Sequence, residues 1–281
     1  MHVYFKTSAV MKITLLFQLF IIISSSIIYA QNISRFRGDN GQGIYNASGV
    51  PTTWMEQDFD WKVALPGKGD SSPGIWGDKI FVTSADENSN RGWLLAVELK
   101  NGKILWRHES SMATYKINSK NSFASVSPTV DANHVYVLWF SEEKSVLSAL
   151  THTGDKVWSS EFDGVYSRHG VGASPIVADE LVIFTCEQEA VKKGPFVSTW
   201  FAVDRNTGQV RWQLERNMVK SNSQSTPIIL RRKGRSLLVF TSEAHGFSGV
   251  DLQSGQLVWE FNPFDSRAIS SPVIANDLII G

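Results

Sequence analysis

The sequence predicts an all-β fold, a β-propeller of four-stranded blades, and two repeated patterns support this prediction. The first pattern covers residues 202–212: a strand ends in Asp204, a turn closes on Gly208, and a second strand ends in Trp212. Glycine supplies the positive φ that such a tight turn needs, and the Asp204 carboxylate can bond back to nearby backbone amides. Further copies of this pattern lie at residues 96–106, 149–158 (one residue shorter) and 249–259.

The repeats keep a period near fifty residues. The final tryptophans of the four copies are separated by 52, 54 and 47 residues, and a second marker, small residues followed by proline, steps by 55, 47, 52 and 45. Such a period, filled with short strands and polar turns, is typical of propeller blades, whereas helical repeats would carry an apolar period near 3.6. The prolines of the second marker are Pro73, Pro128, Pro175, Pro227 and Pro272.

Composition excludes several classes of protein. The 281 residues are 42% hydrophobic and 11% aromatic, which is ample for a large buried core and argues against a disordered chain. The net charge is zero, so electrostatics give no reason to expect a nucleic-acid partner. Cys186 is the only cysteine, so an intrachain disulfide is excluded, and its apolar strand predicts a buried small side chain.

Residues 1–30 have the pattern of a signal peptide. Lys12 precedes the apolar run 13–23, and Ala30 ends a small-residue cleavage pattern. The alternative is an uncleaved membrane anchor, although the apolar run is short for a span. The sequence therefore predicts export to the periplasm or the extracellular space, with membrane contact only through an uncleaved signal.

The remaining chain divides into a lead-in and a propeller. Residues 31–60 are a glycine-rich lead-in that we expect its aromatic residues to pin to the propeller, which covers residues 61–281. A propeller closes on itself to hide its sheet edges, and the last hairpin ends at Gly281 before its blade is complete. We therefore expect a truncated piece of a seven- or eight-bladed propeller. The predicted blades are residues 61–106, 107–158, 159–212, 213–259 and, in part, 260–281.

The eleven-residue pattern resembles the tryptophan-docking motif of PQQ-like repeat propellers, the quinoprotein dehydrogenase superfamily. The resemblance covers about residues 61–281 and is closest at 202–212, and the lead-in with Phe36, Arg37 and Trp54 resembles exported bacterial members. It implies that each tryptophan wedges between neighbouring blades. The predicted docking residues are Trp106, Trp158, Trp212 and Trp259. The alternative role, as platforms that stack on sugars, does not account for their fixed place in the repeat.

The resemblance also implies a choice of function. Enzymes of this superfamily hold pyrroloquinoline quinone and Ca²⁺ over the central channel and oxidise alcohols or sugars, and many carry an adjacent cysteine pair that this chain lacks. Other members are scaffolds without enzymatic activity, and one of these is a lipoprotein of outer-membrane assembly. Because a fold hosts many functions, the repeat alone does not assign one.

The loops that precede the inner strands are the candidate ligand site. In a propeller these loops surround the mouth of the central channel, where polar groups can converge on a ligand. Arg168 could bind a carboxylate and His169 could act as a base, or both could bond only to neighbouring loops. The other candidates at the channel mouth are Ser71, Ser125, Gln224 and Arg267. No catalytic or metal-binding motif was identified.

The sequence therefore supports a first hypothesis and two alternatives. The first is an exported binding or scaffold propeller of the cell envelope, with a protein or envelope ligand on one propeller face. The second is a periplasmic quinoprotein oxidoreductase that uses pyrroloquinoline quinone and Ca²⁺. The third is a carbohydrate-binding propeller that uses exposed aromatic residues such as Trp139 and Trp200.

Overall fold

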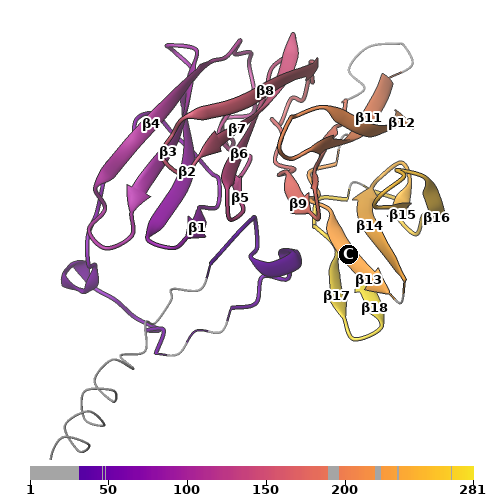
Figure 1. Ribbon diagram of the computed structural model, residues 1–281, viewed down its shortest axis with the longest axis horizontal. Helices are drawn as coiled ribbons and strands as arrows, with labels where there is room; N and C mark the ends of the chain where they lie inside the picture. Colours follow the sequence, from indigo (N-terminus) through magenta and orange to yellow (C-terminus); the bar gives the residue numbers. More distant parts are fainter. Residues whose placement is uncertain are drawn as a thin grey trace, which may run out of the picture. The chain divides into compact units, whose positions relative to one another are not determined.

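The computed structural model describes residues 32–45, 47, 49–188, 196–218, 223–232, 234–266 and 268–281. In this part of the chain, strands β1 to β16 form four antiparallel four-stranded sheets, and β17 pairs with β18 (Figure 1). In each complete sheet every strand pairs with the next one along the chain. The prediction of an all-β propeller is confirmed. The predicted signal segment, residues 1–30, lies outside the described residues.

The first two blades have the same layout. The first contains β1 (Gly74–Trp76), β2 (Lys79–Asp86), β3 (Arg91–Glu98) and β4 (Ile104–Ser111). The second contains β5 (Thr129–Val130), β6 (His134–Phe140), β7 (Lys144–Thr151) and β8 (Lys156–Asp163). The inner strand of each is short and follows directly after its small-residue–proline marker.

The third and fourth blades repeat this layout, and a hairpin follows them. The third blade contains β9 (Ile176–Ala178), β10 (Leu181–Cys186), β11 (Phe196–Asp204) and β12 (Val210–Met218). The fourth contains β13 (Ile228–Arg232), β14 (Arg235–Ser242), β15 (Gly246–Asp251) and β16 (Leu257–Phe261). The hairpin consists of β17 (Val273–Ala275) and β18 (Leu278–Ile280).

A β-bulge recurs at one position of the repeat. In every complete blade the register between the third and fourth strands shifts directly after the small residue that faces the final tryptophan, as at Ala202, opposite Trp212. A bulge bends the strand and increases its twist. The small residue leaves room for the indole, so sequence and register agree in each repeat.

The hydrophobic core lies between neighbouring sheets. Phe81 of the first blade packs with Val137 of the second, and Leu138 of the second packs in another cluster with Phe184 of the third. A further cluster joins the third and fourth blades. Because both faces of an inner blade are covered, its central strands are buried almost throughout. Cys186 is buried as predicted, and burial raises the pKa of its thiol to about 12.

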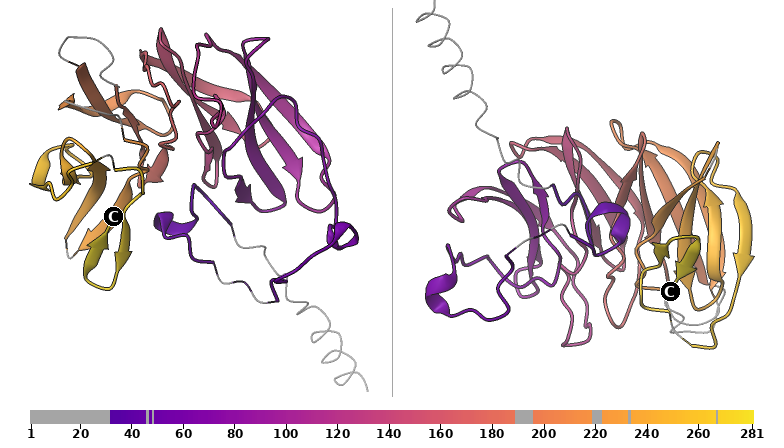
Figure 2. Two further views of the ribbon diagram at one scale, coloured as in Figure 1. Left: turned by 180° about the vertical axis from the view of Figure 1, so that it is seen from behind. Right: turned by 90° about the horizontal axis from the view of Figure 1, so that it is seen from below.

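The lead-in is tied to several blades. Ile33 bridges to Ile75 in β1, and the 3₁₀ turn η1 (Asp39–Gly41) lies against β13 (Figure 2). There, the Asn40 amide nitrogen donates to the Ile229 carbonyl, and the Asn40 oxygen accepts from the Ile229 amide, both at 2.8 Å. A second 3₁₀ turn, η2 (Glu56–Asp58), precedes the first blade. The helices of the described residues are η1 and η2, and neither is long or apolar enough to span a membrane.

Candidate functional site

Three of the predicted docking tryptophans reach the turn of the following repeat. Each indole Nε1 donates to a backbone oxygen there: Trp106 to His152 at 3.0 Å, Trp158 to Arg205 at 2.9 Å and Trp212 to Leu252 at 2.9 Å. Each ring also covers the glycine of that turn, where a Cβ would come within 2.5 to 2.8 Å of an indole carbon. The glycines are Gly154, Gly208 and Gly255. This geometry supports the predicted role, in which each tryptophan ties its own blade to the next.

Trp61 makes the same contact at the start of the propeller. Its Nε1 donates to the Leu99 carbonyl at 3.0 Å, and its ring lies 2.4 Å from where a Cβ on Gly102 would stand. We did not identify it as a docking residue because no strand–turn–glycine pattern precedes it. Its spacing could have identified it, because Trp61 lies 45 residues before Trp106 and the prolines of the repeat are 45 to 55 residues apart.

Trp259 has a different environment. It pairs with Gly249 across β15 and β16, and a Cβ on Gly249 would stand 2.2 Å from its indole ring. The other three repeats have alanine at the position of Gly249. The indole thus lies over its own sheet, and a docking role for Trp259 stays a prediction.

The small-residue–proline marker forms a ladder of hydrogen bonds between blades. The backbone N–H before each proline donates to the hydroxyl at the same position of the next repeat, at 2.9 Å in all four steps. Most of these groups are buried. The ladder explains why serine or threonine precedes the last four of these prolines, because each of those hydroxyls accepts a ladder bond. Its members are Ser72, Ser127, Ser174, Thr226 and Ser271.

Several candidate residues at the channel mouth bond to neighbouring loops. The Ser125 hydroxyl donates to the side chain of Asn121, whose amide in turn donates to the His169 carbonyl. The Gln224 amide donates to the Gly170 carbonyl at 3.1 Å. These contacts join the loops that precede β5, β9 and β13.

The other candidates at the channel mouth are Ser71, Arg168, the side chain of His169 and Arg267. The Ser71 hydroxyl accepts the Thr83 amide at 3.4 Å within the first blade. The residues Arg168 and His169 are exposed, and the Arg168 carbonyl accepts the Asn118 amide at 2.8 Å. Arg267 lies outside the described residues. Thus Ser125, Gln224 and the backbone of His169 come together, and the loop of Ser71 is joined to that of Ser125 by the Asp70 amide, which donates to the Ala124 carbonyl at 3.1 Å.

Glu187 is a buried acid that the sequence analysis missed. It is 5% exposed, and its carboxylate accepts the Trp200 indole N–H at 3.0 Å and the Ser223 amide at 2.6 Å. Burial raises the pKa of its carboxyl group, and the hydrogen bonds and Arg216 oppose that rise. Glu187 therefore holds the loop before β13 against the third blade.

The described residues do not supply a cluster of ligands for the Ca²⁺ that the family resemblance implies. Ca²⁺ takes six to eight oxygen ligands, including carboxylates. In the described ranges, no group of three or more His, Cys, Asp or Glu side chains is placed to hold a metal ion. The Ser125 hydroxyl bonds within its own loop, and the Gln224 amide bonds to the loop before β9. We therefore derive no chemical step through this cofactor.

The two aromatic residues named for carbohydrate binding are buried, so the expectation that they are exposed was wrong. Trp139 is 4% exposed and Trp200 is 1% exposed. Trp200 stacks on Phe240 of the next blade, with ring centroids 4.0 Å apart. Because neighbouring blades cover both faces of a sheet, aromatic residues on central strands belong to the core and cannot stack on a sugar.

Comparisons with known proteins agree with this fold. The family described as outer membrane protein assembly factor BamB matches residues 60–280. A polyvinylalcohol dehydrogenase from a Pseudomonas species is 24% identical over 213 residues, covering 70% of this chain and 31% of the relative. BamB of Yersinia pestis is 25% identical over 186 residues, covering 63% of this chain and 41% of the relative.

A solved structure shows the same architecture. The quinohemoprotein alcohol dehydrogenase of Comamonas testosteroni superposes with a TM-score of 0.58 at 11% identity, covering 91% of this chain and 45% of that one. At this identity the superposition shows the fold alone. The chain spans less than half the length of each of these relatives. By the extent of the family match and the observed fold, this chain belongs to the family of PQQ-like repeat propellers described by the assembly factor BamB.

Proposed function

We propose that this chain acts as an exported binding module of the cell envelope and that residues 44–59 of its lead-in contact a protein partner. The observation that carries the proposal is a run of exposed apolar side chains between η1 and the first blade. Ile44 is 74% exposed, Trp54 62% and Met55 64%. Exposed apolar surface marks an interaction site when it is contiguous, and six exposed apolar side chains lie within residues 44–59. The full set is Ile44, Tyr45, Val50, Trp54, Met55 and Phe59.

The exposed segment is held at both ends. Asn40 fixes one end to β13 through its pair of hydrogen bonds with Ile229, and Trp61 fixes the other end to the first blade. A segment anchored in this way loses less conformational entropy on binding than a free tail. Tryptophan and methionine are also enriched at protein interfaces. The segment therefore has the composition and the support of a contact surface.

The comparisons are consistent with this role. One relative is named an outer membrane protein assembly factor, and the matched family carries the same description. The predicted signal peptide would deliver the chain to the compartment where such a factor acts. Oxidoreductase activity is the second candidate, since the other relative is named a polyvinylalcohol dehydrogenase.

The proposal is tested by comparing capture of partners from envelope extract by variants that differ on the exposed segment. We expect the double variant Trp54→Ser, Met55→Ser to recover at least about tenfold less of a defined partner than wild type, at unchanged melting temperature. Val157→Ser is the matched control because it removes an exposed apolar side chain, 44% exposed, from a blade. Equal recovery by all three proteins would contradict the role of the lead-in.

A further inference from the structure

Arg35, which belongs to the lead-in, has a buried side chain, and most of the N–H donors of its guanidinium lack a partner. Its side chain is 4% exposed, and its Nη2 donates to the Pro227 carbonyl at 2.6 Å. Its Nε and Nη1 are buried and have no hydrogen-bond partner. A buried charge without its partners is costly, and burial lowers the pKa of this guanidinium to about 9. The site is therefore short of one acceptor, and an anion would supply it.

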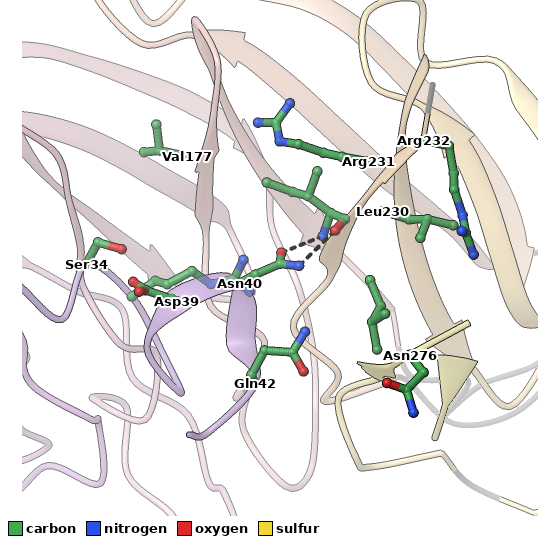
Figure 3. Close-up of a pocket in the computed structure, with 12 residues that line it drawn as sticks. Ser34, Asp39, Asn40, Gln42, Val177, Leu230, Arg231, Arg232 and Asn276 are labelled. Atoms are coloured by element: carbon green, nitrogen blue, oxygen red, sulfur yellow. Dashed lines mark hydrogen bonds between the residues drawn. The ribbon is translucent and has the colours of Figure 1, made fainter. Parts of the chain in front are cut away.

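A pocket of about 490 Å³ adjoins this guanidinium. Arg35 contributes to its lining together with η1, β13 and the β17–β18 hairpin. Figure 3 labels Asp39, Leu230 and Asn276 from these three elements. The pocket extends along β13 from Ile229 to Arg232, whereas the channel-mouth loops precede that strand, so its lining shares no residue with the channel-mouth candidates. It is thus distinct from the candidate site of the sequence analysis.

The charges around the pocket nearly balance without a ligand. Arg231 pairs with Asp179 at 3.0 Å, and Arg232 pairs with Asp277 at 3.2 Å. Asp39 adds one further carboxylate to the lining. Each further negative charge on a ligand would therefore add repulsion from this acid. Among the described residues that line the pocket, Arg35 is the arginine whose Nε and Nη1 lack a hydrogen-bond partner, and a ligand with a single negative charge matches it.

The rest of the pocket lining suits the uncharged part of a small organic ligand. Leu230 and Ile274 supply apolar surface, and Gln42 and Asn276 supply amide groups that can bond a hydroxyl or a carbonyl. Asn40, by contrast, is already used, since both of its amide atoms bond to β13 (Figure 3). The lining therefore offers an apolar surface, a cation and adaptable polar groups.

We propose that this pocket binds a small monocarboxylate, such as an aromatic or short aliphatic acid, whose carboxylate accepts from the unpaired N–H groups of Arg35. Those nitrogens are buried, so the proposed binding requires the guanidinium to turn toward the pocket. This site goes beyond the proposed partner contact and does not depend on it.

Benzoate is the probe and benzamide its matched control, since benzamide has nearly the same shape but no charge. In calorimetry at constant ionic strength we expect saturable binding of benzoate, with a dissociation constant of about 1 mM, and at least about tenfold weaker binding of benzamide. Arg35→Met should lose at least about tenfold in benzoate affinity, while Arg91→Gln, which changes an exposed arginine on β3, should bind as wild type does. Equal affinity of wild type and Arg35→Met would overturn the proposal.

A measurement on the unaltered chain covers the case in which Arg35→Met does not fold. In protein labelled at arginine, the Arg35 Nε–H resonance should shift saturably with benzoate and stay in place with benzamide. No shift of that resonance up to saturating benzoate, or no saturable binding of benzoate at all, would overturn the proposal.

Discussion

Gly208 and Trp158 explain at the scale of single residues why the repeat keeps a glycine in its turn. Gly208 has a φ of 72°, and a Cβ there would lie 2.5 Å from the Trp158 ring. The glycine thus meets two demands: a left-handed backbone and a flat surface for the indole of the preceding blade. Gly77 meets only the first, since its φ is 59° and no atom lies within 4 Å of its Cβ position.

This difference gives a matched pair of variants. We expect Gly77→Ala to lower the free energy of unfolding by about 1 kcal/mol, the cost of a left-handed alanine. Gly208→Ala should cost about 2–4 kcal/mol because the indole is displaced as well. Urea denaturation of both variants measures the difference. Equal losses would show that the tryptophan contact adds no stability.

Asp251 makes stability depend on pH. Its carboxylate accepts the backbone amide of Ser254 and bonds to Arg235, and these contacts lower its pKa from 3.8 to about 2. A carboxyl group with a depressed pKa stabilises the fold fully above 3.8 and loses that contribution as the pH falls toward 2.

We therefore expect the Asp251→Asn variant to be less stable than wild type by about 1 kcal/mol at pH 7, a modest value because solvent screens this turn. The difference in the free energy of unfolding between the two proteins should narrow as the pH falls from 4 toward 2. Urea titrations of both proteins across this range provide the comparison, and a gap that stays constant would argue against the carboxylate.

At the scale of elements, the turns and strands were predictable because their signals are local. The turn at Gly208 and the strand that begins after it lie within one eleven-residue pattern, and both are found in the structure, although that strand continues past the predicted end at Trp212 to Met218. Arg35 and Glu187 escaped prediction because their partners lie 192 and 36 residues away. The exposure of Trp200 was wrongly expected because strand alternation does not reveal that the next blade covers the second face.

The hydroxyl ladder is the element-scale feature that is easiest to test. Thr226→Val keeps the shape of the side chain but leaves the buried Ser174 amide without its acceptor, so we expect a loss of about 1–3 kcal/mol. Thr226→Ser retains the hydroxyl and should lose less than half as much. Equal losses in the two variants, measured by chemical denaturation, would rule out the hydrogen bond as the cause.

At the scale of the whole molecule, the repeated blades form the scaffold and the lead-in carries the individual features. Every blade is tied to the next by a docking contact, a ladder bond or both, and these contacts recur with the period of the sequence. The exposed apolar segment and the pocket at Arg35 both involve the lead-in, which is outside the repeats. Periodicity could therefore predict the scaffold but could not predict these two surfaces.

We propose that the chain acts by binding a partner, and quinone-dependent oxidation of a substrate is the competing candidate. The direct test is to titrate the purified protein, expressed with its signal segment, with pyrroloquinoline quinone and Ca²⁺, and to follow cofactor absorbance and dye reduction with alcohols and sugars. We predict no stoichiometric uptake at micromolar cofactor and no dye reduction. Uptake of one equivalent accompanied by turnover would contradict the claim and identify the chain as a quinoprotein oxidoreductase.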